Sequence, residues 1–376
     1  MTTRRTAVFL VVVPVCTWLL GSTTVEVAAQ GRTRHLVLVT LDGARTQEIF
    51  GGLDLDVLRS TLAEGADPSG TDLYRRYWAA TPEERRARLM PFLWERLLAE
   101  HGSIAGNQAL GSRVLLTNRH RFSYPGYSEI LTGQAHDDVI ESNDPVRNPF
   151  PTVLEFLKRK LSLPASQVAA FASWSVFNWI VEHEEGAITV NAGFEPYDHP
   201  DPRIRLLSSL QTETPTPWDT VRHDAYTFHF AVAHLRSYRP RVLYLALGDD
   251  DDWAHDGRYD RYLDSLARAD RYLERLWAFV QGDEQYRDST TVIITVDHGR
   301  GRTPADWTDH GEDVEGAQDV WLVVASPDVP LRGEWRDAPD VSQNHIAATL
   351  ARFLGFDLAE QNPEAGEPIG TVFEGW

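Results

Sequence analysis

Metal-binding residue types follow two of the apolar segments in this chain. Asp42 comes directly after LVLVTL, and Asp297 and His298 come directly after VIITV. Alone, Asp42 before Gly43 would suit an ordinary turn, and an Asp-His-Gly sequence is often structural. Together, their carboxylate oxygens and imidazole nitrogen match the ligand set of zinc and related divalent ions. The residue types therefore indicate metal-assisted chemistry.

A third apolar segment, LYLAL, leads into the acidic run Asp249–Asp252. Asp251 and His255 are four residues apart, so one helical turn can present both to a single ion. Asp251 is the favoured ligand, and its neighbours are expected to lie behind it or to face solvent. His310, in DWTDHGED, is a further candidate ligand. Acidic runs and isolated histidines are also common on solvated surfaces.

A candidate nucleophile, Ser123, lies in RFSYPGYSEILTG. Pro125 and Gly126 predict a tight turn that leads into a helix, so Ser123 would lie at the positive N-terminal end of that helix. This position favours both an alkoxide and a bound anion. The alternative is an ordinary helix-capping serine.

Strands alternating with helices must position these residues. Short apolar segments predict strands at 35–41, 113–117, 167–172, 241–247, 290–296 and 319–325. Apolar residues at helical spacing predict helices at 81–100, 151–160, 218–236, 257–280 and 341–354. The fold class is therefore α/β, with a mostly parallel central sheet and helices on both faces. Residues 44–110 and 175–235 interrupt the alternation and are predicted to be insertions at the ligand-facing edge, or else peripheral packing.

The N-terminus has the pattern of a secretory signal peptide, predicted over residues 1–29. Arg4 and Arg5 precede an apolar core, and Val27-Ala28-Ala29 offers a cleavage site. The apolar core is shorter than a membrane span, so we expect no membrane span after cleavage. The mature chain, residues 30–376, is predicted to be a single exported domain, periplasmic or extracellular. Its only cysteine, Cys16, lies within the signal, so no disulfide is expected.

The net charge of −19 argues against a nucleic-acid partner, because the phosphate backbone would be repelled by the protein surface. The chain has only two lysines, Lys158 and Lys160, so its other basic side chains are arginines and histidines.

Taken together, these motifs resemble the alkaline phosphatase superfamily, particularly its nucleotide pyrophosphatase/phosphodiesterase-like branch. The resemblance runs from Asp42 to the closing segment 341–355. It implies that Ser123, two residues before Pro125, is the nucleophile. It also implies that Asn143 contacts a phosphoryl oxygen. Seven metal-ligand positions follow from it: Asp42, Ser123, Asp251, His255, Asp297, His298 and His310.

The resemblance implies two Zn²⁺ ions, although another divalent metal would suit the same ligands. One ion, held by Asp42, Asp297 and His298, would activate Ser123, and the other would neutralise the leaving oxygen. The predicted function is hydrolysis of a phosphate monoester or diester through a phosphoseryl intermediate. Monoesters usually require an additional arginine or lysine, for which Arg119, Arg121 and Arg300 are the candidates.

Two alternatives remain. Sulfatases of the same fold resemble the pattern Cys/Ser-x-Pro-x-Arg, in which the cysteine or serine is oxidised to an aldehyde. Here Tyr127 stands at the arginine position, and Asp297-His298 stands where sulfatases commonly carry Asp-Asn. The sequence therefore favours phosphate over sulfate esters. The other alternative is an exported binding protein that kept the fold and lost turnover.

Overall fold

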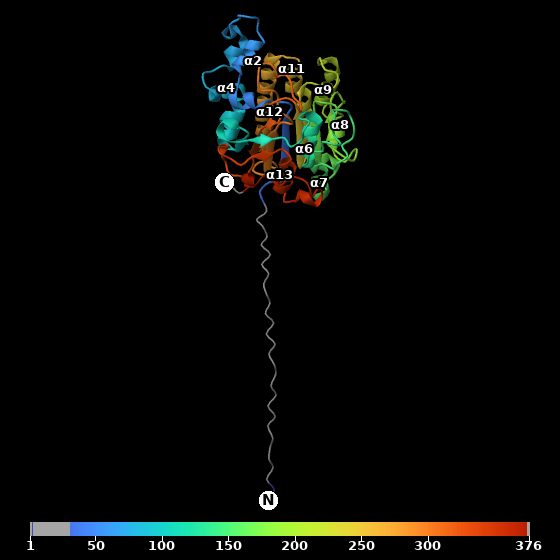
Figure 1. The fold of residues 1–376 in the computed structure, drawn as a ribbon. Helices are drawn as coiled ribbons and strands as arrows, with labels where there is room; N and C mark the ends of the chain where they lie inside the picture. Colours follow the sequence, from blue (N-terminus) through green and yellow to red (C-terminus); the bar gives the residue numbers. More distant parts are fainter. Residues whose placement is uncertain (1, 3–30, 374–376) are drawn as a thin grey trace. The chain divides into compact units, whose positions relative to one another are not determined.

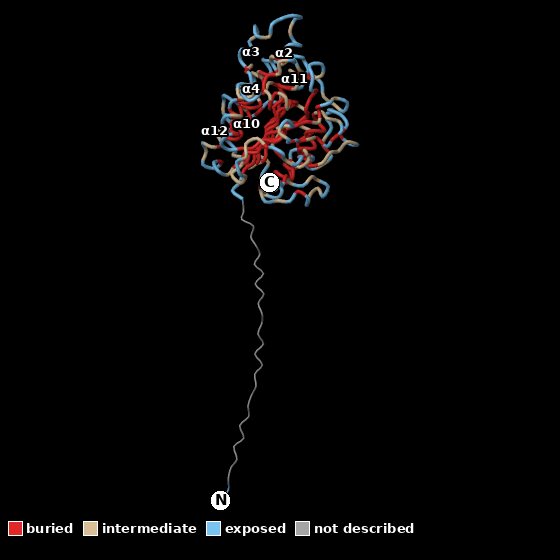
Figure 2. The backbone as a smooth tube through the Cα atoms, turned by 60° about the vertical axis from the view of Figure 1, so that its left-hand side comes forward, coloured by how far each residue is buried: buried red, intermediate tan, exposed pale blue. Residues whose placement is uncertain are grey.

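The structure is a computed structural model, and it describes Thr2 and residues 31–373. The predicted signal peptide, residues 1–29, lies outside the described residues apart from Thr2. The described residues from Gly31 onward belong to one compact unit. Figure 1 shows its strands in the interior with helices packed around them, and Figure 2 shows that the buried backbone concentrates there.

Strand β1 (His35–Leu41) lies inside the main sheet and is buried along its whole length. Its residues are mostly apolar, as expected of a strand that is covered on both faces. β1 pairs in parallel with β6 (Val242–Leu247) on one side and with β7 (Thr290–Thr295) on the other. The carboxyl ends of these three strands therefore meet at one edge of the sheet, which is where parallel α/β folds bind ligands.

The main sheet has eight strands in the order β10-β2-β9-β7-β1-β6-β4-β5. The remaining strands are β2 (Gly102–Ala105), β4 (Val168–Ala172), β5 (Thr189–Ala192), β9 (Leu322–Ala325) and β10 (Gly333–Glu334). β9 runs antiparallel to its neighbours β7 and β2, and the other pairings in the sheet are parallel. The predicted α/β fold with a mostly parallel sheet is confirmed.

Two predicted strands differ from the structure. The segment 113–117 forms only β3 (Val114–Leu115), which belongs to a separate three-stranded sheet with β8 (Asp319–Val320) and β11 (Val341–Ser342). The segment 319–325 divides between β8 in this small sheet and β9 in the main sheet. Apolar composition predicts that a segment is buried, but it does not specify which sheet the segment joins.

Apart from α9, which the sequence analysis did not predict, the longer helices lie within or close to the predicted segments. They are α4 (Pro82–Leu89), α6 (Ser123–Thr132), α7 (Val153–Lys160), α9 (Pro202–Glu213), α10 (Asp224–Tyr238), α12 (Tyr259–Gly282) and α13 (His345–Phe353). The predicted helix 81–100 is not continuous. α4 begins with the expected capping box at Thr81 and ends before Pro91, and a π-helix (Leu93–Leu97) and the short α5 (Leu98–Glu100) follow. Proline cannot continue the hydrogen-bond ladder, which accounts for the break.

The segments predicted as insertions contain both peripheral helices and strands of the main sheet. Residues 44–110 form α1 (Thr46–Gly51), α2 (Leu55–Ser60) and α3 (Asp72–Tyr77), and they also include β2. Residues 175–235 form α8 (Phe177–Ile180) and α9, most of α10, and the edge strand β5. Both segments therefore extend the sheet at its two sides as well as covering it. None of the helices in the described residues has the length and apolar character needed to cross a membrane.

Candidate metal centre and nucleophile

Two groups of metal-ligand residues lie at the carboxyl edge of the central strands. Asp42, Asp297 and His298 form one group, here called the buried cluster, and all three side chains are buried. Asp251, His255 and His310 form the other, here called the outer cluster. In each group the ligand atoms lie within 4.8 Å of one another.

The buried cluster has the spacing that a tetrahedral zinc ion requires. His298 Nε2 lies 3.5 Å from Asp42 Oδ1, 3.3 Å from Asp297 Oδ2 and 3.4 Å from Ser123 Oγ. Zinc–ligand bonds of 2.0–2.2 Å at tetrahedral angles place neighbouring ligand atoms about 3.3–3.6 Å apart. The hydroxyl of Ser123 lies at a similar distance from His298 Nε2 and is therefore a candidate for a fourth ligand.

The atoms that face away from this ligand position are held by hydrogen bonds. Tyr127 OH donates to Asp42 Oδ2 at 2.8 Å, and Gly43 N–H donates to Asp297 Oδ1 at 3.1 Å. His298 Nδ1 lies 2.9 Å from Gly299 O, so the proton on Nδ1 leaves the lone pair on Nε2. Asp42 Oδ1 and Asp297 Oδ2 accept no hydrogen bond among the described residues. Such outer contacts orient ligands for a metal ion.

The protonation behaviour of the buried cluster also suits a cation. Burial and the neighbouring carboxylates raise the pKa of Asp42 and of Asp297 well above the ordinary aspartate value. Burial lowers the pKa of His298 to about 4, so its ring is neutral near pH 7. Two buried carboxylates beside a neutral imidazole stay ionised only with added positive charge, which a divalent ion would supply.

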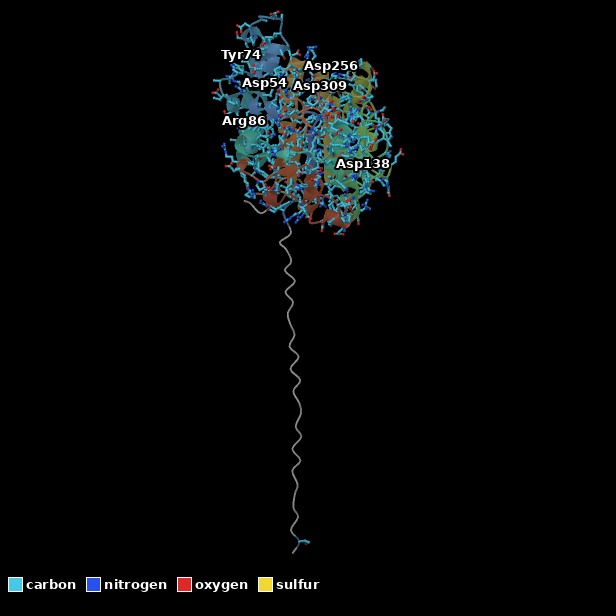
Figure 3. All side chains as sticks on the ribbon, viewed as in Figure 1. Asp54, Tyr74, Arg86, Asp138, Asp256 and Asp309 are labelled. Atoms are coloured by element: carbon cyan, nitrogen blue, oxygen red, sulfur yellow. The ribbon has the colours of Figure 1, made fainter. Side chains whose placement is uncertain are left out.

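The outer cluster is built on α11 (Asp249–His255), a single short helix directly after β6. Asp251 Oδ2 lies 3.3 Å from His255 Nε2, which in turn lies 3.0 Å from His310 Nε2. The first separation matches the tetrahedral range of about 3.3–3.6 Å, and the second is slightly shorter. Burial lowers the pKa of His310 to about 2, so it too is a neutral ligand. In Figure 3, Asp256 and Asp309, the chain neighbours of the two histidines, lie at the same end of the molecule.

Ser123 is the first residue of α6, as the turn sequence predicted, and it is buried. Gly126 allows the first turn of this helix to approach β7, because a Cβ at Gly126 would lie 2.3 Å from Asp297 O. Asn143 Oδ1 accepts the Tyr124 N–H at 2.9 Å, which brings Asn143 beside the nucleophile. The amide Nδ2 of Asn143 is thus the group that could face a phosphoryl oxygen.

Arg300 is a site residue whose role differs from the one the sequence suggested. Its side chain is fully buried, and it forms an ion pair with Asp251 Oδ1 and hydrogen bonds to Asp251 O and Thr308 O. Burial works against ionisation of Asp251, but Arg300 and His255 hold the pKa of Asp251 well below its ordinary value. Arg300 therefore contacts a metal ligand and not an open substrate position.

The other two candidate arginines lie elsewhere. Arg119 is exposed and pairs with Asp138 at 3.4 Å. Arg121 donates to Glu312 O at 2.8 Å, and it therefore links the loop before Ser123 to the segment that carries His310.

Sequence reasoning did not find several supporting contacts. Gln343 Nε2 donates to both Gly126 O and Asp297 O at 3.0 Å, which ties the nucleophile helix to the end of β7. Arg45, buried beside Glu48, donates to Gly301 O at 2.9 Å and so joins the segments after β1 and β7. Asp250, expected behind the cluster or in solvent, is buried. No short-range pattern marks such contacts, because their partners are remote in sequence.

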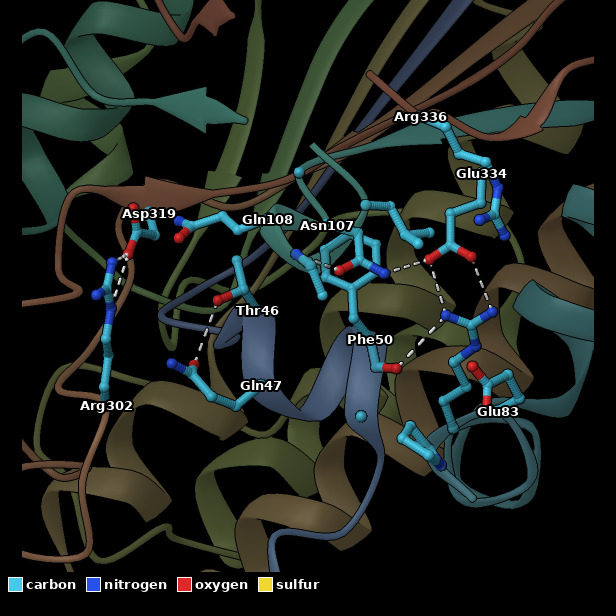
Figure 4. A pocket seen from close by; sticks show the side chains of 16 residues that line it. Thr46, Gln47, Phe50, Glu83, Asn107, Gln108, Arg302, Asp319, Glu334 and Arg336 are labelled. Carbon is cyan, nitrogen blue, oxygen red and sulfur yellow. Dashed lines mark hydrogen bonds and ion pairs between the residues drawn. The ribbon is translucent and has the colours of Figure 1, made fainter. Parts of the chain in front are cut away.

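A cavity of about 660 Å³ lies beside α1 and is lined by residues such as Gln47, Asn107, Gln108 and Arg336 (Figure 4). Arg302 and Asp319 pair at one end of it, and Glu334 lies at the other. Neither Ser123 nor any residue of the two clusters lines this cavity. We therefore assign the chemistry to the clusters, where metal ligands and a nucleophile meet.

Solved structures with this fold include several ester-cleaving and related proteins. The lipoteichoic acid synthase LtaP of Listeria monocytogenes is 13% identical, with 89% of this chain and 74% of that chain covered and a TM-score of 0.56. The phosphonate monoester hydrolase of Agrobacterium radiobacter is 13% identical, with 91% and 77% covered and a TM-score of 0.55. The 2-O GAG sulfatase BT1596 is 13% identical, with 91% and 74% covered and a TM-score of 0.55. No curated protein sequence matches this chain.

The sulfatase family model matches residues 196–356. This segment carries five of the metal-ligand positions, but neither Asp42 nor the Ser123 motif. The match favours the sulfatase alternative over the nucleotide pyrophosphatase-like branch that the sequence motifs suggested. The chain has the alkaline phosphatase-like fold, and its residues 196–356 match the sulfatase family model.

Proposed function

We propose that this protein is an exported metal-dependent hydrolase of singly charged tetrahedral esters, with phosphodiesters and phosphonate monoesters as the first substrate candidates. The observation that carries the proposal is the position of Ser123 Oγ, 3.4 Å from His298 Nε2 at the open corner of the buried cluster. Ser123 also begins a ten-residue helix, whose N-terminal dipole favours negative charge at that point.

In the proposed reaction, Ser123 Oγ attacks the phosphorus atom. An O–P bond forms to serine, and the bond from phosphorus to the leaving alcohol or phenol breaks. Water then attacks the phosphoserine, releases the product and returns the hydroxyl. Divalent ions in the two clusters would lower the pKa of the Ser123 hydroxyl and stabilise the leaving oxygen. Asn143, fixed against the Tyr124 N–H, would orient a non-bridging oxygen.

The charge of the site favours a monoanionic ester over a dianionic one. A dianionic phosphate monoester usually requires an arginine or lysine with free donors. Arg300 is the buried cation nearest the clusters, and its contacts with Asp251 and Thr308 occupy the ends of the guanidinium group. Arg119 is paired elsewhere. None of the three candidate arginines therefore directs a buried guanidinium group at a second negative charge on the substrate.

A sulfate monoester is the second candidate substrate, and the match of residues 196–356 to the sulfatase family favours it. It carries the same single charge and tetrahedral geometry. The nucleophile segment supports it less, because the arginine expected at position 127 is a tyrosine whose hydroxyl is bonded to Asp42.

The test is a panel of four 4-nitrophenyl substrates: a phosphodiester, a phosphonate monoester, a phosphate monoester and a sulfate. We expect the diester and the phosphonate to be cleaved fastest, and Ser123→Ala to abolish their turnover. Cleavage of the sulfate alone, with a mass loss of two hydrogens at Ser123, would replace this proposal with a sulfatase. A metal-free protein that cleaves none of the four would support the binding-protein alternative.

A further inference from the structure

The two clusters differ in the charge that surrounds their ligands. The buried cluster has two carboxylates, Asp42 and Asp297. Among the described residues, the only basic side chain within ion-pair distance of either carboxylate is His298. The outer cluster has one carboxylate, Asp251, and this is already paired with Arg300. An arginine guanidinium stays protonated at all ordinary pH values. Before any metal binds, the carboxylate of the outer cluster is thus already paired with an arginine, whereas neither carboxylate of the buried cluster has such a partner among the described residues.

Arg300 is fixed in this position by the fold. It lies two residues after His298, its side chain is fully buried, and its Nη1 donates to Thr308 O on the loop that leads to His310. A Cβ at Gly43 would lie 2.7 Å from Arg300 Nε and 2.5 Å from Asp251 Oδ1, so a glycine there leaves room for the pair. The guanidinium cannot swing into solvent without opening this packing.

The exposure of the ligands also favours tighter metal binding by the buried cluster. The side chains of Asp297 and His298 are 0% exposed, whereas the side chain of His255 is 44% exposed. Attraction between a cation and its ligands is stronger where water is excluded. The outer ion would therefore be held in a more solvated position by ligands with less net charge.

The two clusters also differ in the hydrogen bonds and ion pairs that hold their ligand carboxylates. In the buried cluster, Tyr127 and the Gly43 N–H hold the far oxygens of both aspartates, and the near oxygens accept no hydrogen bond within residues 31–373. In the outer cluster, both oxygens of Asp251 already have partners, Arg300 for Oδ1 and His255 for Oδ2. An outer ion must share Asp251 with the guanidinium.

We propose that Arg300 makes the two metal positions unequal, so that the buried cluster retains its ion and the outer cluster holds an exchangeable one. The inference rests on the proposed function only in that both clusters bind divalent ions. It adds a regulatory consequence: the concentration of free metal around the protein sets the fraction of molecules that carry the outer ion. Arg300 keeps Asp251 in place when that ion is absent.

The experiment is a zinc titration of the chelator-stripped protein by calorimetry, with a competing chelator to resolve the tighter phase. We expect one ion per chain to bind at least tenfold more tightly than the second. Two ions of equal affinity would overturn the inference while leaving the proposed function standing. Failure to bind any divalent ion would overturn both.

Two variants show which cluster accounts for each phase of the zinc titration. Arg300→Gln removes the fixed charge, and we expect the weaker phase to tighten about tenfold or more while the tighter phase is unchanged. The matched control is Arg302→Gln, because Arg302 pairs with Asp319, which belongs to neither cluster, and should leave both affinities as they are. An unchanged or weakened second phase in folded Arg300→Gln would contradict the inference.

A second variant keeps the test decisive if Arg300→Gln does not fold. His255→Ala alters an exposed side chain on the short helix α11. We expect it to remove the weaker phase alone and to leave one tightly bound ion after dialysis. Loss of the tighter phase instead would show that the affinities are assigned to the wrong clusters.

Discussion

Ser123 Oγ lies 3.4 Å from His298 Nε2, although the two residues are 175 positions apart in the chain. Ser123 begins helix α6, and His298 follows the end of β7. Their approach depends on Gly126, which has no side chain to separate the helix from Asp297 O. The proposed nucleophile and a candidate metal ligand are therefore positioned by the same close contact between a helix and a strand end.

Removing the Ser123 hydroxyl should separate catalysis from metal binding. For Ser123→Ala we expect kcat to fall by roughly 10³-fold or more, because the covalent step is lost. The number of bound zinc ions should stay near that of the native protein, since three ligands of the buried cluster remain. The checks are steady-state kinetics and metal analysis. Ser128→Ala, in the same helix, is the control, and equal loss in both variants would contradict the nucleophile assignment.

Tyr127 should tune the buried metal position through Asp42. Tyr127→Phe removes the 2.8 Å hydrogen bond to Asp42 Oδ2, and loss of such an outer contact typically weakens metal affinity about 10–100-fold. Calorimetric zinc titration measures the change. Tyr244→Phe is the matched control, because Tyr244 is also buried but its hydroxyl contacts Thr40. Unaltered affinity in Tyr127→Phe would show that this bond does not orient the ligand.

Glu129 should matter for turnover because it holds the loop that precedes Ser123. Its carboxylate accepts hydrogen bonds from the backbone N–H groups of Thr117 and Asn118, at 2.9–3.2 Å, and from both side chains. Glu129→Gln leaves a buried N–H without an acceptor, so we expect a loss of about 1–3 kcal/mol in the free energy of unfolding, together with lower kcat.

The control for Glu129 is Glu155→Gln. Glu155 is likewise buried and accepts backbone N–H groups from His183 and Glu184, but it lies in helix α7 and does not contact the loop before Ser123. It should lose similar stability without the kinetic change, as measured by urea denaturation and kcat. An equal fall of kcat in both variants would show that Glu129 affects turnover only through general destabilisation.

Asp270 should give the metal-free protein a pH-dependent stability. Burial raises the pKa of Asp270 to about 6, although its carboxylate accepts the N–H groups of Phe92 and Leu93. Because the folded pKa lies above the unfolded one, the contribution of Asp270 to stability is greatest below about pH 4 and is lost as pH rises through 6. The shift corresponds to about 2–3 kcal/mol.

The measurement is urea denaturation of stripped native protein and Asp270→Asn at several pH values between 4 and 8. We expect the native protein to lose stability relative to the variant as pH rises through that window. Parallel curves for the two proteins would contradict the assignment to Asp270.

The sequence predicted the parts of this molecule that depend on short-range patterns. The strand before Asp42, the strands before Asp249 and Asp297, and the helix starting at Ser123 were all predictable, because apolar segments and turn residues determine them locally. The four-residue spacing of Asp251 and His255 also predicted correctly that they would share a helix.

Long-range arrangement was not predictable in the same way. The division of 319–325 between two sheets depends on pairing partners far along the chain. The ion pair of Arg300 with Asp251 joins positions 49 residues apart, and an arginine after Asp-His-Gly suggested a substrate contact equally well. Gln343 carries no motif, yet it ties Gly126 to Asp297. Such contacts arise from packing, which no local pattern encodes.

The central position of β1 between β6 and β7 has an evolutionary consequence. The strands that carry the metal-binding side chains are the best shielded part of the protein, while the segments 44–110 and 175–235 lie at the two flanks of the sheet. Mutations that reshape the flanks can alter which leaving group is accepted without moving the reactive atoms. Diversification of substrate range in relatives of this chain should therefore concentrate in those flanking segments.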